Sequence, residues 1–173
     1  MNKSKVSIGL INPKSPENVA SVMRSAGNFR VDSVLYTGAR YPRALKLKTS
    51  SVDMSRKVSQ DIPLNQSESL IDDVDETMKI VCVELVENSM SLPEYKHPEN
   101  AFYIFGPEDG SIGQSIINKA DDVVYVPTKG CMNLSATVNV LLYDRLSKQA
   151  QRFEGNELIR ESRDINNSLK LTL

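Results

Sequence analysis

Short apolar runs alternate with segments of helical periodicity along most of the chain, and this order leaves few possible architectures. We expect strands at residues 6–11, 33–37, 79–85, 101–105 and 123–127. We expect helices at residues 17–28, 112–120 and 133–152, and a short acidic helix at about 67–77. Near-continuous apolar strands spaced by helices are typical of a parallel sheet with both faces covered. The predicted fold class is therefore α/β, with a mostly parallel sheet and helices on both of its faces.

Chain length and composition indicate one ordinary globular domain. The 173 residues suit a single core, and 40% of them are hydrophobic and 25% charged. This composition excludes a disordered, collagen-like or disulfide-built chain. We place the domain at residues 1–153 and interpret residues 154–173 as a polar C-terminal tail that forms a weaker helix.

Charge and cysteine usage narrow the partners and the compartment. The formal net charge is -1, so any nucleic acid must be held by a local basic patch rather than by the field of the whole molecule. The two cysteines, Cys82 and Cys131, form no CxxC pair, which is typical of a reduced cytosolic protein. No apolar run reaches the ~18–20 residues needed to cross a bilayer. We therefore expect a cytoplasmic protein that makes no use of a membrane.

A basic stretch lies within residues 38–66, a region without a clean period that we expect to be a long loop. Between positions 40 and 57 the only acid is Asp53, which gives this stretch a local charge of +5. It is either a solvated loop or a surface that contacts RNA phosphates. Its basic residues are Arg40, Arg43, Lys46, Lys48, Arg56 and Lys57.

The first of three unusual segments spans residues 12–26, after the first strand. Ser15 can cap a helix, and Pro16 suits its first position. Asn18 and Arg24 lie six positions apart on this helix, and Arg24 is surrounded in sequence by small and apolar residues. Two interpretations stand: Arg24 forms an internal salt bridge, or its guanidinium clamps a phosphate.

The other two segments also follow predicted strands. Residues 105–113 hold three glycines at a strand-to-helix turn, but they lack the lysine of a phosphate-binding loop. Glu108 and Asp109 in this turn would repel phosphates and would suit a cationic group or sugar hydroxyls. In residues 126–137, Asn133 and Ser135 fall at a helix start, where both are favoured caps.

In this order the three segments resemble the three motifs of the SPOUT (alpha/beta-knot) RNA methyltransferases, in the branch that methylates the ribose 2'-hydroxyl. Asn-Pro-x-x-Pro-x-Asn with an Arg six residues later is similar to motif one. Phe-Gly-Pro-Glu after a strand is similar to motif two. Pro-Thr-Lys-Gly-Cys-Met-Asn-Leu-Ser, running into a helix with Leu-Tyr-Asp at 142–144, is similar to motif three. The similarity covers about residues 6–150.

The resemblance implies a fold, a cofactor, a substrate and a set of site residues. The fold would include a deep trefoil knot in the C-terminal third, which periodicity cannot predict. The cofactor would be S-adenosylmethionine, without a metal, and the substrate an RNA, transfer RNA or ribosomal RNA, bound by a homodimer. Residues expected to contact the cofactor are Val83, Gly106, Val126, Cys131, Met132 and Leu134. Residues expected around the reacting centre are Arg24, Asn18, Glu108, Asn133 and Ser135.

The chain departs from the family pattern at a few positions, and these leave a second function open. The departures are Ala20, Ser111, Cys131 and Glu84, the last a carboxylate where small polar residues are common. The alternative function is a non-catalytic RNA-binding protein that retains the fold. A small-molecule nucleotide enzyme is disfavoured because the glycine fingerprint is missing. For His97, the only histidine, we expect an exposed loop position rather than a general base.

Overall fold

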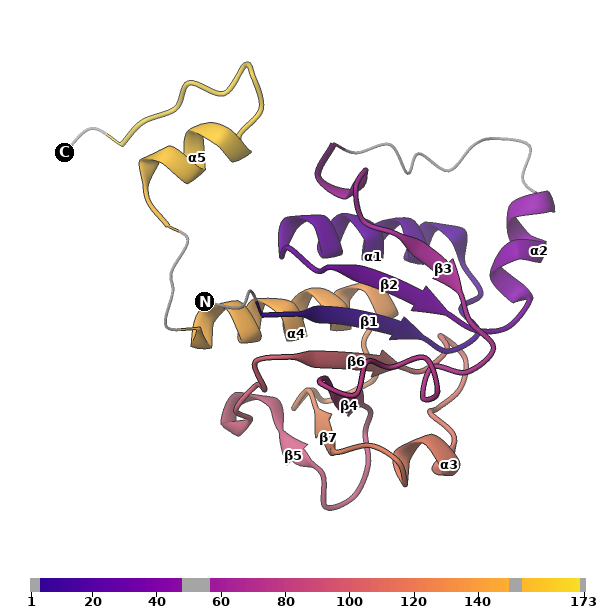
Figure 1. Ribbon diagram of the computed structural model, residues 1–173. Helices are drawn as coiled ribbons and strands as arrows, with labels where there is room; N and C mark the ends of the chain where they lie inside the picture. Colours follow the sequence, from indigo (N-terminus) through magenta and orange to yellow (C-terminus); the bar gives the residue numbers. More distant parts are fainter. Residues whose placement is uncertain (1–3, 48–56, 150–153, 172–173) are drawn as a thin grey trace.

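The computed structural model describes residues 4–47, 57–149 and 154–171. They form a seven-stranded sheet with all strand pairs parallel, in the order β3-β2-β1-β6-β4-β7-β5 (Figure 1). The strands are β1 (Val6–Leu10), β2 (Ser33–Tyr36), β3 (Leu64–Gln66), β4 (Lys79–Val83), β5 (Met90–Ser91), β6 (Ala101–Phe105) and β7 (Asp122–Tyr125). The helices are α1 (Pro16–Asn28), α2 (Arg40–Leu47), α3 (Gln114–Ile117), α4 (Leu134–Lys148) and α5 (Asn156–Ser162), with 3-10 helices η1 (Lys57–Ser59) and η2 (Leu92–Glu94). The predicted parallel α/β sheet is confirmed.

Strands β1 and β6 are buried on both faces, because alternate side chains point into two separate cores. On one face, Tyr103 belongs to a core that the long helices α1 and α4 cover side by side. On the other face, Phe102 packs in a smaller core with Ile112 and side chains from the turns before β4. Gly9 in β1 makes room for this ring, since a Cβ there would lie 2.8 Å from Cζ of Phe102.

The two long helices start where the sequence predicts. In α1 the side chain of Ser15 accepts a hydrogen bond from the backbone N–H of Asn18, and Pro16 occupies the first turn. Helix α4 is capped by Asn133, whose side chain accepts from the backbone N–H groups of Ser135 and Ala136. Both caps lie at the same end of the sheet as the carboxyl ends of β1, β6 and β7.

The prediction of a long loop over residues 38–66 is wrong for the described parts of this range, which leave out residues 48–56. Its first part forms helix α2, whose one buried residue, Tyr41, packs edge-on against Tyr36 with ring centroids 5.1 Å apart. Pro42 lies in the first turn of this helix, where its missing N–H breaks no helical hydrogen bond. Further along, β3 pairs with β2 and becomes an edge of the sheet.

The predicted acidic helix at 67–77 is also wrong, because side chains there bond to their own local backbone. The Ser67 hydroxyl oxygen accepts from the backbone N–H of Ser69, and Asp75 Oδ1 accepts from the backbone N–H of Thr77. Such local bonds compete with helical hydrogen bonds and favour turns. Lys5 Nζ lies 2.8 Å from Asp75 Oδ2, so these turns are held against the start of the sheet.

The C-terminal tail forms the helix α5, which Figure 1 shows set apart from the sheet. None of its residues is buried. Among the described residues, no helix has both the length and the apolar character that crossing a bilayer requires.

Candidate active site

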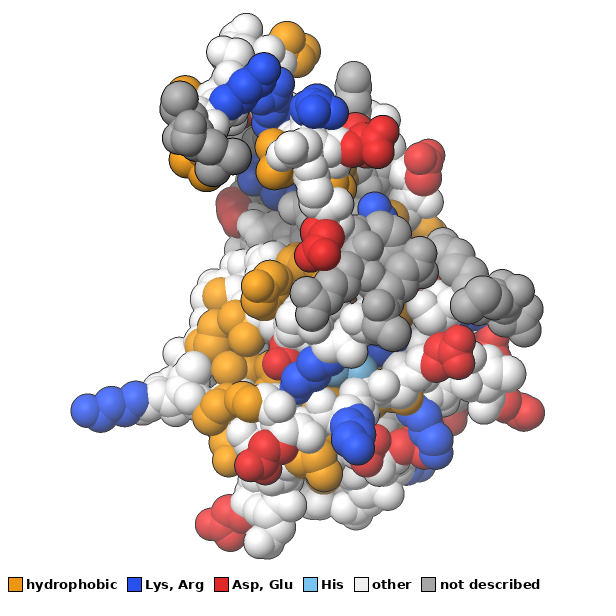
Figure 2. Space-filling model, turned by 90° about the vertical axis from the view of Figure 1, so that its left-hand side faces the viewer, with side chains coloured by type: hydrophobic (Ala, Val, Ile, Leu, Met, Phe, Trp, Pro, Cys, Tyr) orange, Lys and Arg blue, Asp and Glu red, His pale blue; other side chains and the backbone are white. Residues whose placement is uncertain are grey.

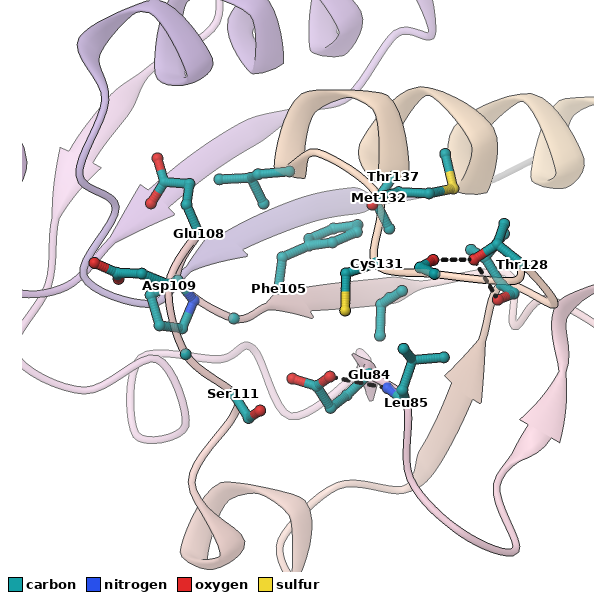
Figure 3. A pocket seen from close by; sticks show the side chains of 17 residues that line it. Glu84, Leu85, Phe105, Glu108, Asp109, Ser111, Thr128, Cys131, Met132 and Thr137 are labelled. Carbon is teal, nitrogen blue, oxygen red and sulfur yellow. Dashed lines mark hydrogen bonds between the residues drawn. The ribbon is translucent and has the colours of Figure 1, made fainter.

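A cavity of about 370 Å³ opens at the carboxyl ends of β4, β6 and β7 (Figure 3). Ligands of parallel α/β sheets gather at this end of the strands. Three chain segments form its walls: residues 83–85 after β4, residues 105–111 after β6, and residues between 126 and 137 after β7. The second and third of these walls are two of the segments that the sequence singled out, and they are brought together as expected.

All six residues expected to contact the cofactor line this cavity: Val83, Gly106, Val126, Cys131, Met132 and Leu134. At Gly106 a Cβ would come within 3.2 Å of Oε2 of Glu84 and 3.3 Å of the backbone N of Ile112, so the chain passes close to both groups there. Most of the lining side chains are apolar, and Thr128 and Thr137 add hydroxyl groups. Such a mixture suits a ligand that has an apolar ring system and a few polar groups.

A chain of hydrogen bonds joins the starts of α1 and α4 to the loop after β6. Nδ2 of Asn18 donates to Oε1 of Glu108 over 3.2 Å, and Nδ2 of Asn133 donates to Oδ1 of Asn18 over 3.1 Å. The hydroxyl of Ser135 donates to Oδ1 of Asn133 over 2.7 Å. Four of the five residues expected around the reacting centre therefore belong to one continuous network at the cavity's edge, to which Glu108 contributes a lining side chain.

Glu108 is held as a carboxylate by this network. Its two oxygens accept from the backbone N–H groups of Lys14 and Ser15, at 2.9 and 3.0 Å, in addition to Asn18. Burial alone would raise the pKa of Glu108, but the hydrogen bonds from Ser15, Lys14 and Asn18 outweigh it and lower the pKa. An ionised carboxylate with both oxygens occupied orders the loop before α1 and is unsuited to donating a proton.

Arg24 lies apart from the other predicted catalytic residues. Its side chain is exposed on α1 and does not line the cavity, although small and apolar residues surround it in the sequence. Its neighbours in sequence, Ser25 and Ala26, are buried instead, because they point towards the sheet. Within the described residues no acid pairs with Arg24, which removes the internal salt bridge and leaves the guanidinium available to a phosphate.

The basic residues predicted to contact RNA lie in different surroundings. Arg40 makes a bidentate ion pair with Asp109 in the cavity wall, with both N–O distances at 2.8 Å, and this bond lowers the pKa of Asp109. Arg43 and Lys46 are exposed on α2, one turn apart. Lys57 begins η1, whereas Lys48 and Arg56 lie outside the described residues.

A second polar cluster surrounds His97, whose prediction as an exposed loop residue is wrong. Only 5% of its side chain is exposed, and its ring nitrogens lie 2.7 Å from the Tyr103 hydroxyl and 2.8 Å from Oδ2 of Asp144. Arg145, also buried, donates to the Tyr103 hydroxyl and to the carbonyl oxygens of Pro98 and Glu99. Burial lowers the pKa of His97 and raises that of Tyr103 to about 12. The polar neighbours of His97 in sequence gave no sign of this burial, which depends on β6 and α4.

The chain belongs to the SpoU rRNA methylase family, whose model matches residues 5–143. This match confirms the resemblance that the three segments indicate. No curated protein sequence matches the chain. Among the described residues, no group of three or more His, Cys, Asp or Glu side chains is arranged to hold a metal ion.

Solved structures of RNA methyltransferases share the fold at low sequence identity. The SpoU methyltransferase AviRb from Streptomyces viridochromogenes, in complex with AdoMet, has a TM-score of 0.67 and 16% identity over 88% of this chain, which spans 61% of AviRb. The A. aeolicus TrmH/SpoU tRNA modifying enzyme has a TM-score of 0.68 and 16% identity over 92% of this chain and 85% of its own. A structure concerned with 2-OH methylation of C/U34 on tRNA has a TM-score of 0.67 and 16% identity, covering 86% and 92%. At these identities the likeness shows the fold alone.

Proposed function

We propose that this protein is an S-adenosylmethionine-dependent methyltransferase that methylates a ribose 2'-hydroxyl in RNA. The observation that carries the proposal is the convergence of motifs two and three on one cavity, with motif one joined to both by the Asn18–Glu108 and Asn133–Asn18 hydrogen bonds. Transfer RNA is the favoured substrate, and ribosomal RNA is the second candidate. Two structures that this chain nearly matches in length, the A. aeolicus enzyme and the C/U34 methylation structure, both concern tRNA.

The cavity fits S-adenosylmethionine in size and in chemistry. Its volume lies within the range of small-molecule sites, and its apolar side chains suit an adenine ring. Three lining carboxylates, from Glu84, Glu108 and Asp109, suit a ligand with cationic groups, and no lysine or arginine is found among the lining residues that the structure describes. The bound cofactor would supply a methyl group on a sulfonium, from which a neutral thioether departs as a good leaving group.

The chain's own residues would then position the RNA. Arg24, exposed on α1, would bind the phosphate beside the target ribose and orient the 2'-hydroxyl towards the cavity. The Glu108–Asn18–Asn133 network would hold the start of α1, and with it Arg24, at a constant distance from the cavity edge. Because a guanidinium stays protonated in proteins, Arg24 serves to orient and to stabilise charge, while phosphate or water takes the proton. The exposed Arg43 and Lys46 would add phosphate contacts.

We also propose a homodimer, a trefoil-knotted chain and a cytoplasmic location. Val140 and Tyr143 on α4 remain 37% and 65% exposed although neighbouring positions of the helix are buried. On the face shown in Figure 2, apolar side chains gather in a patch, as expected of a surface that a second copy covers. A Tyr143→Arg variant should sediment as a monomer, whereas a wild-type monomer would contradict the dimer. Two unpaired cysteines suit a reducing compartment.

Methyl transfer from labelled cofactor to total cellular RNA tests the proposed function. Wild-type protein should label the RNA, and Arg24→Lys should not, although it should still bind the cofactor. The alternative, a non-catalytic RNA-binding protein, predicts that both proteins bind RNA and that neither labels it. Labelling of the same extent with both proteins would contradict the role given to Arg24.

A further inference from the structure

The carboxylates that line the cavity differ in how far nearby positive charge neutralises them. Its three carboxylates belong to Glu84, Glu108 and Asp109. Asp109 is neutralised by Arg40 and by Lys14, whose Nζ lies 3.6 Å from Oδ2. Glu108 faces the start of α1, where free N–H groups and the helix dipole favour a negative charge. Glu84 has neither kind of compensation.

Glu84 is instead held by two neutral backbone groups. Its Oε1 accepts from the N–H of Leu85 over 2.9 Å, and its Oε2 accepts from the N–H of Ile112 over 3.0 Å. A carboxylate offers about four acceptor sites, so about two are left after these bonds. Among the described residues, no lysine or arginine forms an ion pair with Glu84.

The position of this carboxylate is fixed by both walls of the cavity. Glu84 follows β4, and its side chain reaches across to the loop between β6 and α3, as Figure 3 shows for Glu84 and Ser111. Gly106 permits this close approach, since a Cβ at that position would lie 3.2 Å from Oε2. A half-buried, fixed and unneutralised negative charge therefore lines the space that the ligand would occupy.

We infer that Glu84 is a specificity-determining residue that provides the counter-charge for the methyl donor and so distinguishes the donor from its product. The inference rests on the proposed function. S-adenosylmethionine carries one net positive charge at neutral pH, because its sulfonium and ammonium groups outnumber its carboxylate. In the transfer, an oxygen lone pair of the ribose forms a bond to the methyl carbon, the carbon–sulfur pair returns to sulfur, and the hydroxyl proton leaves. The product S-adenosylhomocysteine has a neutral sulfur and no net charge.

A fixed carboxylate attracts the cationic donor and gives the neutral product no comparable stabilisation. The attraction is stronger inside a cavity than in water, because the effective dielectric constant is lower. Glu84 thus favours exchange of product for donor after each turnover. The same carboxylate also holds the loop at Ile112, and that second effect would act equally on donor and product.

Calorimetric titration of three ligands separates these two effects. The probes are S-adenosylmethionine, sinefungin, which has a cationic amine in place of the sulfonium, and S-adenosylhomocysteine. For Glu84→Gln we expect affinity for the two cationic ligands to fall about tenfold, or about 1.4 kcal/mol, and affinity for S-adenosylhomocysteine to change less than about twofold. Glu84→Ala should show the same change in ratio, and thermal melting of each variant checks its folding.

The matched control is Glu87→Gln, which removes an exposed carboxylate three residues away that does not line the cavity. It should leave all three affinities unchanged. An equal loss for all three ligands in Glu84→Gln would overturn the inference and leave Glu84 as a loop-holding residue. Failure of wild-type protein to bind any of the three would instead overturn the proposed function itself.

Discussion

The side-chain amide of Asn133 donates a hydrogen bond to Oδ1 of Asn18 over 3.1 Å, although 115 positions separate the two residues in the chain. Asn133 is also the N-cap of α4, and Asn18 in turn contacts Glu108 after β6. These two bonds through Asn18 therefore connect two helix starts and a strand end at the edge of the cavity. Substitutions here should alter both the stability of the fold and the geometry of the site.

Asn133→Ala should lower the free energy of unfolding by about 1 kcal/mol, because α4 loses the side chain that caps it. Urea denaturation measures this change as a lower midpoint. Asn139→Ala is the control, since Asn139 is exposed on the same helix and alanine is a better helix former. An equal loss in the two variants would show that the cap and its bond to Asn18 contribute nothing particular.

Arg24→Lys should reduce methyl transfer to RNA by at least about a hundredfold, because a lysine cannot reproduce the bidentate geometry of a guanidinium on a phosphate. Its affinity for S-adenosylmethionine should not change, since Arg24 does not line the cavity. The transfer rate and a cofactor titration check the two parts separately. Arg160→Lys, an exposed position on α5, should behave as wild type in both. Retained turnover in Arg24→Lys would be incompatible with the proposed role.

Replacing both Arg43 and Lys46 with glutamine should weaken RNA binding and flatten its dependence on salt. Each lost phosphate contact removes about 0.7–0.9 from the slope of log K against log salt concentration, so the pair should remove about 1.5. Filter-binding titrations at several salt concentrations give this slope. The double variant Lys96→Gln, Lys119→Gln has the same net charge change at exposed positions elsewhere and should keep the wild-type slope. An unchanged slope in the α2 variant would discard this surface as an RNA contact.

The stability of the fold should decrease as the pH falls below about 6.5. His97 has a lowered pKa because it is buried, so the unfolded chain binds a proton more readily than the folded one. Its stabilising contribution is complete above the pKa of the unfolded histidine and is lost as the pH falls through that of the folded one. Asp144 favours the protonated ring, but burial and the charges of Arg145 and Lys148 oppose it.

Denaturation midpoints between pH 7.5 and pH 5.5 check this expectation, with an NMR titration of the single histidine as a direct reading of its pKa. His97→Gln keeps a neutral polar side chain and should lose less stability over that range than wild type. If the two proteins lose stability in parallel, His97 is not the titrating group. An NMR pKa above that of free histidine would contradict the direction of the shift.

Local sequence signals predicted the parts of the fold that local forces determine. Ser15 and Pro16 mark the start of α1 because a cap and a fixed φ act within one turn. The apolar runs predicted β1 and β6 because both of their faces are buried. Helix α2 was missed because a short basic segment with a single buried aromatic residue, Tyr41, has too weak a periodicity.

Contacts between residues that are far apart in the sequence could not be predicted from local sequence signals. The pairing of Arg40 with Asp109 joins α2 to the loop after β6, and neither residue indicates the other in the sequence. His97 is buried by Tyr103 and Asp144, which lie on β6 and α4. The expectation that the residues of the cavity lie together came only from the resemblance of the motifs to those of a family. Spacing and composition alone place none of them together.

Alkaline hydrolysis of the labelled RNA tests the central claim most directly, because a 2'-O-methyl group protects the adjoining phosphodiester bond from alkali. When this protein methylates RNA with labelled S-adenosylmethionine, alkaline hydrolysis should leave the label in alkali-resistant dinucleotides. Digestion of these dinucleotides to nucleosides should then release the label as a 2'-O-methylnucleoside. Label that appears in mononucleotides after alkali, on a methylated base, would contradict the assignment of the ribose 2'-hydroxyl as the acceptor.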